Sequence, residues 1–367
     1  MNMNDSHYNL GEIIEKALHQ ERLDKGEIVF LLGLKQKSQI NAVLETARKL
    51  RYRHFGDRVF LYGFVYVSTF CRNDCHFCYY RSANSLPERY RRDESEIVEA
   101  ARCLAESGVH LIDLTLGEDP QYFQDPKAGF DKFIQLVKTV RKTTGLPIMA
   151  SPGVIPDHVL SGLVKAGASW YACYQETHNR GLFKRLRPGQ SYTARMENKE
   201  LAGQLGLLIE EGLLCGVGES AEDIADSIEV MRFLEASQMR TMSFVPQAGT
   251  PMQTFKPPAS LQEIITIAVL RLAFPDKLIP ATLDIAGLAG LQSRLEAGAN
   301  VVTSLVPPGF GLAGVAQNSL DIADAKRTTG KILLELEKLD LQSASMEEYL
   351  NWINNRRREV TNVVSRK

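Results

Sequence analysis

The chain lacks any long apolar segment, and this absence excludes several classes of protein. No stretch approaches the roughly 20 apolar residues that span a bilayer. The first twenty residues hold no apolar core of signal-peptide length. An excess of one charge is also missing, because 43 basic and 44 acidic residues leave a net charge of −1. We therefore expect a cytoplasmic protein that binds a small molecule, with no nucleic-acid partner and no membrane partner.

Cysteine is sparse, and six cysteines in 367 residues are too few for a disulfide scaffold. Cys103, Cys173 and Cys215 are scattered along the chain, and we predict that each is a small buried residue. Low-complexity segments and linkers rich in proline or glycine are absent as well, so composition marks no domain boundary. A hydrophobic content of 44% and a charged content of 24% are typical of a globular protein with a large core.

The remaining cysteines lie together in the stretch CRNDCHFCYY, as Cys71, Cys75 and Cys78. A structural zinc site normally has four protein ligands, and His76 is poorly placed between two of the cysteines to be the fourth. Three thiolates can instead hold a [4Fe–4S] cluster in which one iron stays free to bind a small molecule. We predict such an open cluster. A zinc site, or a cluster completed by a ligand from elsewhere in the chain, is the alternative.

From residue 59 onward, short apolar runs alternate with amphipathic stretches of helical period. The eight runs cover residues 59–69, 111–116, 146–152, 170–176, 207–214, 241–247, 278–284 and 300–307. Strands that alternate with helices form parallel right-handed units, and eight units close a barrel. We therefore predict an α/β fold, a (β/α)₈ TIM-type barrel at residues 59–317. A helical extension at 1–58 and a helical tail at 318–367 flank it. Reactive groups of such barrels lie at the carboxyl ends of the strands, where the cysteine motif begins.

An open cluster after the first barrel strand, with Tyr79 directly after the third cysteine, resembles the radical S-adenosylmethionine enzymes. The resemblance implies that S-adenosyl-L-methionine binds the free iron of the cluster. It also implies that an external electron donor supplies the electron which cleaves this cofactor to a 5′-deoxyadenosyl radical. The cofactor contacts implied by the motifs LTLGEDP, ASPG, YQET and SYTAR are Glu118, Ser151, Glu176 and Arg195, together with Tyr79.

Within that family, the chain resembles the branch that contains biotin synthase and the [FeFe]-hydrogenase maturase, and in particular the 3-methylornithine synthases of pyrrolysine biosynthesis. The similarity runs from about residue 45 to about residue 316, through segments such as GLPIMASPG, LIPATLD and AGANVVTS. It implies a mutase that converts L-lysine to (3R)-3-methyl-D-ornithine. The implied substrate contacts are a guanidinium for the carboxylate and acidic partners for the ammonium groups: Asp113, Arg240, Thr282 and Asp284.

Other functions stay open at this point. Thr282 stands where those enzymes carry serine, so a different small amino acid is an alternative substrate. A hydrogenase-maturase-like activity is a second alternative. Sulfur insertion of the biotin synthase type needs a second cluster, for which the scattered cysteines offer no ligand set. A non-enzymatic iron–sulfur protein would not need carboxylates such as Asp113 and Asp284 at the ends of its strands.

Overall fold

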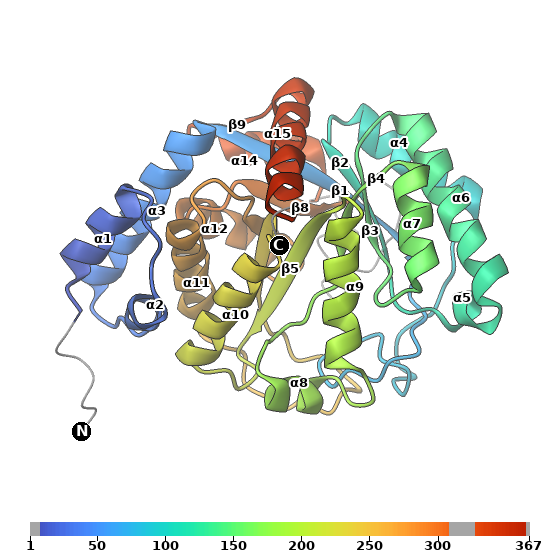
Figure 1. The fold of residues 1–367 in the computed structure, drawn as a ribbon, viewed down its shortest axis with the longest axis horizontal. Helices are drawn as coiled ribbons and strands as arrows, with labels where there is room; N and C mark the ends of the chain where they lie inside the picture. Colours follow the sequence, from blue (N-terminus) through green and yellow to red (C-terminus); the bar gives the residue numbers. More distant parts are fainter. Residues whose placement is uncertain (1–7, 308–326, 365–367) are drawn as a thin grey trace.

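The computed structural model describes residues 8–307 and 327–364. Within these ranges the chain forms the predicted barrel, with its strands running in parallel around a common axis (Figure 1). The strands are β1 (Arg58–Ser68), β2 (Leu111–Leu116), β3 (Ile148–Ser151), β4 (Ala168–Ala172), β5 (Leu208–Cys215), β6 (Gln238–Ser243), β7 (Pro280–Thr282) and β8 (Val301–Leu305). Each lies in or overlaps one of the predicted apolar runs, so the fold prediction is confirmed.

The sheet has the order β6-β5-β4-β3-β2-β1-β8-β7, and its two edges meet between β6 and β7. An isolated parallel bridge joins Gln238 to Leu278 across this seam. The Met239 N–H donates to the Leu278 carbonyl at 3.0 Å, and the Leu278 N–H donates to the Ser237 carbonyl at 3.1 Å. The barrel is therefore nearly closed, and the side chains at one end of its strands surround a shared space.

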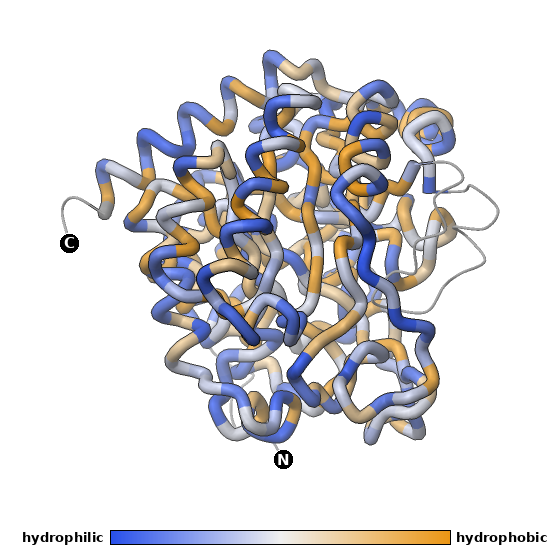
Figure 2. The backbone as a smooth tube through the Cα atoms, turned by 90° about the vertical axis from the view of Figure 1, so that its right-hand side faces the viewer, coloured by the Kyte–Doolittle hydropathy of each residue, from blue (hydrophilic) through white to orange (hydrophobic). Residues whose placement is uncertain are grey.

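Helices cover the outside of the barrel, and their apolar residues join the core around the strands. Figure 2 shows hydrophilic and hydrophobic residues alternating along the helices. Because the strands are buried on both faces, they read as nearly continuous apolar runs rather than as alternating patterns. The covering helices are α4 (Glu94–Glu106), α5 (Pro120–Gln124), α6 (Pro126–Thr144), α7 (Asp157–Ala166), α8 (Arg180–Leu186), α9 (Tyr192–Gln204), α10 (Ala221–Phe233), α11 (Ser260–Ala273), η1 (Gly287–Gly290) and α12 (Leu291–Glu296).

The N-terminal segment forms helices that pack outside the barrel. These are α1 (Leu10–Leu18), α2 (Lys25–Leu32) and α3 (Lys37–Phe55). Helix α2 contacts α10 and α11, and α3 contacts α11, so the segment extends the outer layer. In the described part of the chain, no helix combines the length and the apolar character that crossing a membrane requires.

The C-terminal segment closes the amino end of the barrel. It contains α14 (Thr329–Glu337), β9 (Gln342–Ser343), which pairs with β1, and α15 (Met346–Val364). From α15, the Tyr349 hydroxyl donates to the Tyr62 hydroxyl at 2.7 Å, and the Trp352 ring stacks on Trp170. Helix α15 and helix α8 lie at opposite ends of the molecule (Figure 1). The predicted boundary at residue 317 lies outside the described residues.

Candidate functional site

The three clustered cysteines lie on the loop that follows β1, at the carboxyl end of the barrel. The His76 N–H donates to the Leu186 carbonyl at 2.9 Å and so holds this loop against α8. Gly117, after β2, permits the close approach of Cys71, because a Cβ there would lie 2.8 Å from the Cys71 Cβ. The loop is therefore fixed by backbone contacts and leaves its thiols to face inward.

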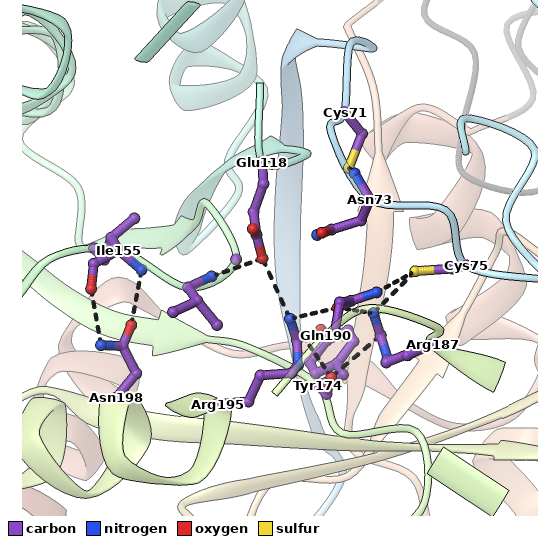
Figure 3. Close-up of polar contacts among 12 residues, drawn as sticks. Cys71, Asn73, Cys75, Glu118, Ile155, Tyr174, Arg187, Gln190, Arg195 and Asn198 are labelled. Atoms are coloured by element: carbon purple, nitrogen blue, oxygen red, sulfur yellow. Dashed lines mark hydrogen bonds and ion pairs between the residues drawn. The ribbon is translucent and has the colours of Figure 1, made fainter. Parts of the chain in front are cut away.

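A cavity of about 220 Å³ lies between this loop and the ends of β2, β3 and β4. Its lining includes all three clustered cysteines. It also includes four of the predicted cofactor contacts: Glu118, Ser151, Glu176 and Arg195. Figure 3 shows Glu118 and Arg195 on one side of this space and the two labelled cysteines on the other. Residues that are far apart in the sequence thus meet around one volume.

The thiols of this cavity suit an iron–sulfur cluster. In the described residues, no group of three or more His, Cys, Asp or Glu side chains could hold one metal ion. A cubane cluster binds each thiolate at a different iron and therefore needs more widely spaced sulfurs. Burial raises the pKa of the Cys71 and Cys78 thiols, so both need compensating positive charge to ionise. An iron–sulfur core between them would supply that charge.

Glu118 is buried on the loop after β2 and accepts hydrogen bonds from both sides of the cavity. Its Oε2 accepts from the Arg72 Nε at 2.9 Å, and its Oε1 accepts from the Val154 N–H at 3.1 Å. The Arg195 Nη1 lies 3.5 Å from the Oε1. Gly153 is needed beside it, because a Cβ at this position would lie 2.5 Å from the Glu118 Cγ.

Glu176 lies on the segment after β4 with a φ of +67°, a conformation that a non-glycine residue rarely adopts. Its Oε1 accepts from the Arg187 Nη2 at 2.9 Å, whereas its buried Oε2 has no hydrogen-bond partner. Burial raises the pKa of this carboxyl, although Arg187 and Arg195 oppose the rise. A buried acceptor without a partner is suited to an ammonium or hydroxyl group of a bound molecule.

A second cavity of about 160 Å³ adjoins the first and extends into the barrel. The two share Cys78, Ser151 and Glu176 in their linings. Asp113 on β2 lies in its wall and accepts from the Ser151 hydroxyl at 2.7 Å. Burial raises the pKa of Asp113 to about 7, and this carboxylate has no ion pair with any described residue. It is therefore poised to receive a cation.

Arg240 and Asp284 line the same inner cavity, but each already has a charged partner. The Arg240 Nε donates to the Glu210 Oε1 at 2.9 Å, and its Nη2 is buried without a hydrogen-bond partner. Asp284 accepts from the Arg327 Nη1 at 2.8 Å. It also accepts from Ser304, which, like Glu176, has a positive φ. Strained backbone therefore occurs at two strand ends around the site.

Thr282, at the end of β7, is fully buried beside these groups and does not line either cavity. Its hydroxyl donates to the Asp284 Oδ2 at 3.3 Å, so it acts on the inner cavity through that carboxylate. Tyr79 also lies outside both linings, and its carbonyl accepts from the Asn84 side chain at 2.9 Å. Its neighbours Phe77 and Tyr80 do line the outer cavity.

Several residues at the site were not identified from the sequence. Glu210 could have been identified, because two acids interrupt the apolar run LLIEEGLL in the same way that Asp113 interrupts the run LIDLTL. Arg187 lies in the basic stretch RLRPGQS, which by itself is typical of a solvated surface. No sequence pattern marks Arg327 as a residue of the site. Cys173 lines the outer cavity and, like Cys215, is buried as predicted, whereas Cys103 on α4 is only partly buried, so that part of the prediction was wrong.

Comparisons with known proteins identify the family of the chain. A model of the radical SAM superfamily matches residues 65–231. The chain is 40% identical to the 3-methylornithine synthase of Methanosarcina acetivorans, over 91% of this chain and 94% of that protein. The crystal structure of a methylornithine synthase matches with a TM-score of 0.88 at 39% identity, over 93% of this chain and 99% of that chain. The [FeFe]-hydrogenase maturase subunit of Thermotoga maritima is 28% identical, over 79% of this chain and 82% of that protein.

Proposed function

Because the chain belongs to the radical SAM superfamily, and within it to the 3-methylornithine synthases, we propose that it isomerises L-lysine to (3R)-3-methyl-D-ornithine. The observation that carries the proposal is the pair of adjoining cavities. One has the thiols and paired charges that an iron–sulfur cluster and S-adenosyl-L-methionine need, and the other has charges that suit a diamino acid.

In this proposal Cys71, Cys75 and Cys78 hold the [4Fe–4S] cluster, and the polar residues of the outer cavity hold the cofactor. The buried free Oε2 of Glu176 suits the ammonium group, and the guanidinium of Arg195 suits the carboxylate. When bound and reduced, the cluster supplies the electron that cleaves S-adenosyl-L-methionine to a 5′-deoxyadenosyl radical. The protein's part is to orient the reactants and to exclude water.

The inner cavity binds the amino acid in this proposal. Arg240 offers its unpaired Nη2 to the α-carboxylate, and Asp113 receives one ammonium group. Asp284 receives the other and shares its charge with Arg327, which is possible because a carboxylate has about four acceptor positions. Thr282 and Ser304 orient Asp284 through their hydroxyls. The shared wall at Cys78, Ser151 and Glu176 brings the substrate next to the cofactor.

Three parts of the proposal concern the wider chain. An external electron donor reduces the cluster. The N-terminal extension at 1–58 and the tail at 318–367 frame a catalytic barrel at 59–317. The reaction takes place in the cytoplasm, where the thiols stay reduced.

The test is to load the protein anaerobically with iron and sulfide, reduce it, and incubate it with S-adenosyl-L-methionine and isotopically labelled lysine. We expect a methyl-branched isomer of lysine by mass spectrometry and NMR, and label that passes into 5′-deoxyadenosine. Ornithine and other small amino acids serve as competing substrates. Cofactor cleavage without any branched product from lysine would retain the radical chemistry and overturn the proposed substrate.

A further inference from the structure

Arg187 joins two parts of the site that no sequence pattern connects. Its Nη1 donates to the Cys75 Sγ at 3.3 Å, and its Nη2 donates to the Glu176 Oε1 at 2.9 Å and to the Tyr174 carbonyl at 3.2 Å. Figure 3 shows it beside Gln190, whose Nε2 donates to the same sulfur at 3.0 Å. The Arg187 side chain is 9% exposed, so its charge acts in a dry environment.

The clustered thiols differ in the donors around them. The Sγ of Cys71 accepts from the backbone N–H of Asn73 at 3.4 Å. Cys75 instead accepts from two side chains, one of which is a cation. Hydrogen bonds to ligand sulfurs stabilise the more negative, reduced state of an iron–sulfur cluster. A charged donor is roughly twice as strong as a neutral one, and low dielectric strengthens it further.

We propose that Arg187 is a positioning residue that raises the reduction potential of the cluster through Cys75 while it holds Glu176 in place for the cofactor. Gln190 adds a smaller, uncharged contribution at the same sulfur. The inference rests on the proposed function, because it needs the cluster to be held by these cysteines. It goes further by assigning the control of electron entry to one guanidinium.

The experiment compares reduction potentials, measured by redox titration with EPR detection, in anaerobically loaded variants. Arg187→Gln removes the charge, and we expect the equilibrium constant for one-electron reduction to fall at least tenfold, which corresponds to about 59 mV. Arg187→Lys keeps the charge and should restore part of the loss. Arg185→Gln is the matched control, since Arg185 lies on α8 two residues before Arg187, is exposed and should leave the potential unchanged.

Cofactor affinity, measured by equilibrium dialysis with S-adenosyl-L-homocysteine, separates the two roles of Arg187. A fully loaded Arg187→Gln protein with the wild-type potential but weaker affinity would show that Arg187 only supports Glu176, and would overturn the inference. If this variant does not assemble the cluster, Gln190→Leu decides. Gln190→Leu should lower the reduction potential, by less than is expected for Arg187→Gln. An unchanged potential in Gln190→Leu also overturns the inference. A wild-type protein that assembles no cluster would instead refute the proposed function.

Discussion

The two ends of the barrel are built from the same strands and differ in how their polar groups are used. At the amino end, the Tyr62 and Tyr349 hydroxyls bond each other, and both ring nitrogens of His110 have backbone partners. At the carboxyl end, Glu176 and Arg240 keep buried polar atoms without hydrogen-bond partners. Buried polar atoms without partners also occur at the amino end, on the neutral side chains of Gln238 and Asn300, but these residues line neither cavity. Glu176 and Arg240 do line the cavities, so the carboxyl end is the one arranged for ligands. The amino end stabilises the fold, and the carboxyl end carries the chemistry.

The largest effect should come from the thiols of the carboxyl end. Cys78→Ala removes a proposed cluster ligand, so we expect loss of the cluster and of all cofactor cleavage, whereas the barrel stays folded. Iron analysis, visible absorbance and circular dichroism measure these outcomes. Cys173→Ala is the matched control, because Cys173 lines the same cavity outside the motif. Loss of the cluster in the control would indicate a fourth protein ligand.

The next largest effect should come from Asp113. Asp113→Asn leaves a buried ammonium of the substrate without its counter-charge, and kcat/KM for lysine should fall by roughly several hundredfold. Because burial raises the pKa of Asp113 to about 7, the wild-type kcat/KM should rise as the pH increases through about 7 and then level off. The variant should lose this rise. Steady-state rates between about pH 6 and pH 8 test it, and an unchanged profile would remove Asp113 from the substrate site.

The contrast between the two ends also explains what could be predicted from the sequence. The fold followed from eight apolar runs and the intervening helical periods, because both are local patterns. The cysteine motif is equally local. Asp113 and Asp284 were recognisable because an acid inside or at the end of a buried apolar run costs free energy unless it is paired. The short strand β9 carries no such signal, since two residues are too few to show a period.

The partners of the charged groups could not be predicted, because they depend on which strand ends meet in space. Arg327 lies 43 residues after Asp284 and is brought to it only by the closed barrel. Arg187 reaches Cys75 across 112 residues. Tyr79 was chosen for its position after the third cysteine, yet it lines neither cavity, whereas Phe77 lines both. Side-chain direction within an irregular loop is set by tertiary contacts.

A smaller effect, on stability rather than on cofactor binding, is expected at the amino end. Tyr349→Ala removes a fully buried ring that packs against Phe60 and Tyr62, and should lower the free energy of unfolding by about 3 kcal/mol. Tyr349→Phe removes only the hydroxyl contact and should cost about 1 kcal/mol. Urea titrations measure both. Cofactor affinity of the folded variants should equal that of the wild type, and a tenfold loss would show that the two ends are coupled.

The smallest effect should come from Thr282, which ends β7 and lines neither cavity, and whose hydroxyl contacts Asp284 and Ser304. Its hydroxyl donates to the Asp284 Oδ2, and serine can make the same bond, so Thr282→Ser removes only one methyl group. Removing one carbon from an apolar pocket changes kcat/KM by about tenfold or more. Thr282 is not in the cavity wall, so the loss of its methyl group should have a smaller effect. We therefore expect less than a tenfold change in kcat/KM for lysine.

Thr282→Val keeps the size and loses the donor, and should reduce kcat/KM more than serine does, because Asp284 then loses an orienting partner. If serine has the larger effect, the methyl group itself shapes the pocket. The preference of the enzyme among small amino acids would then be set at this position.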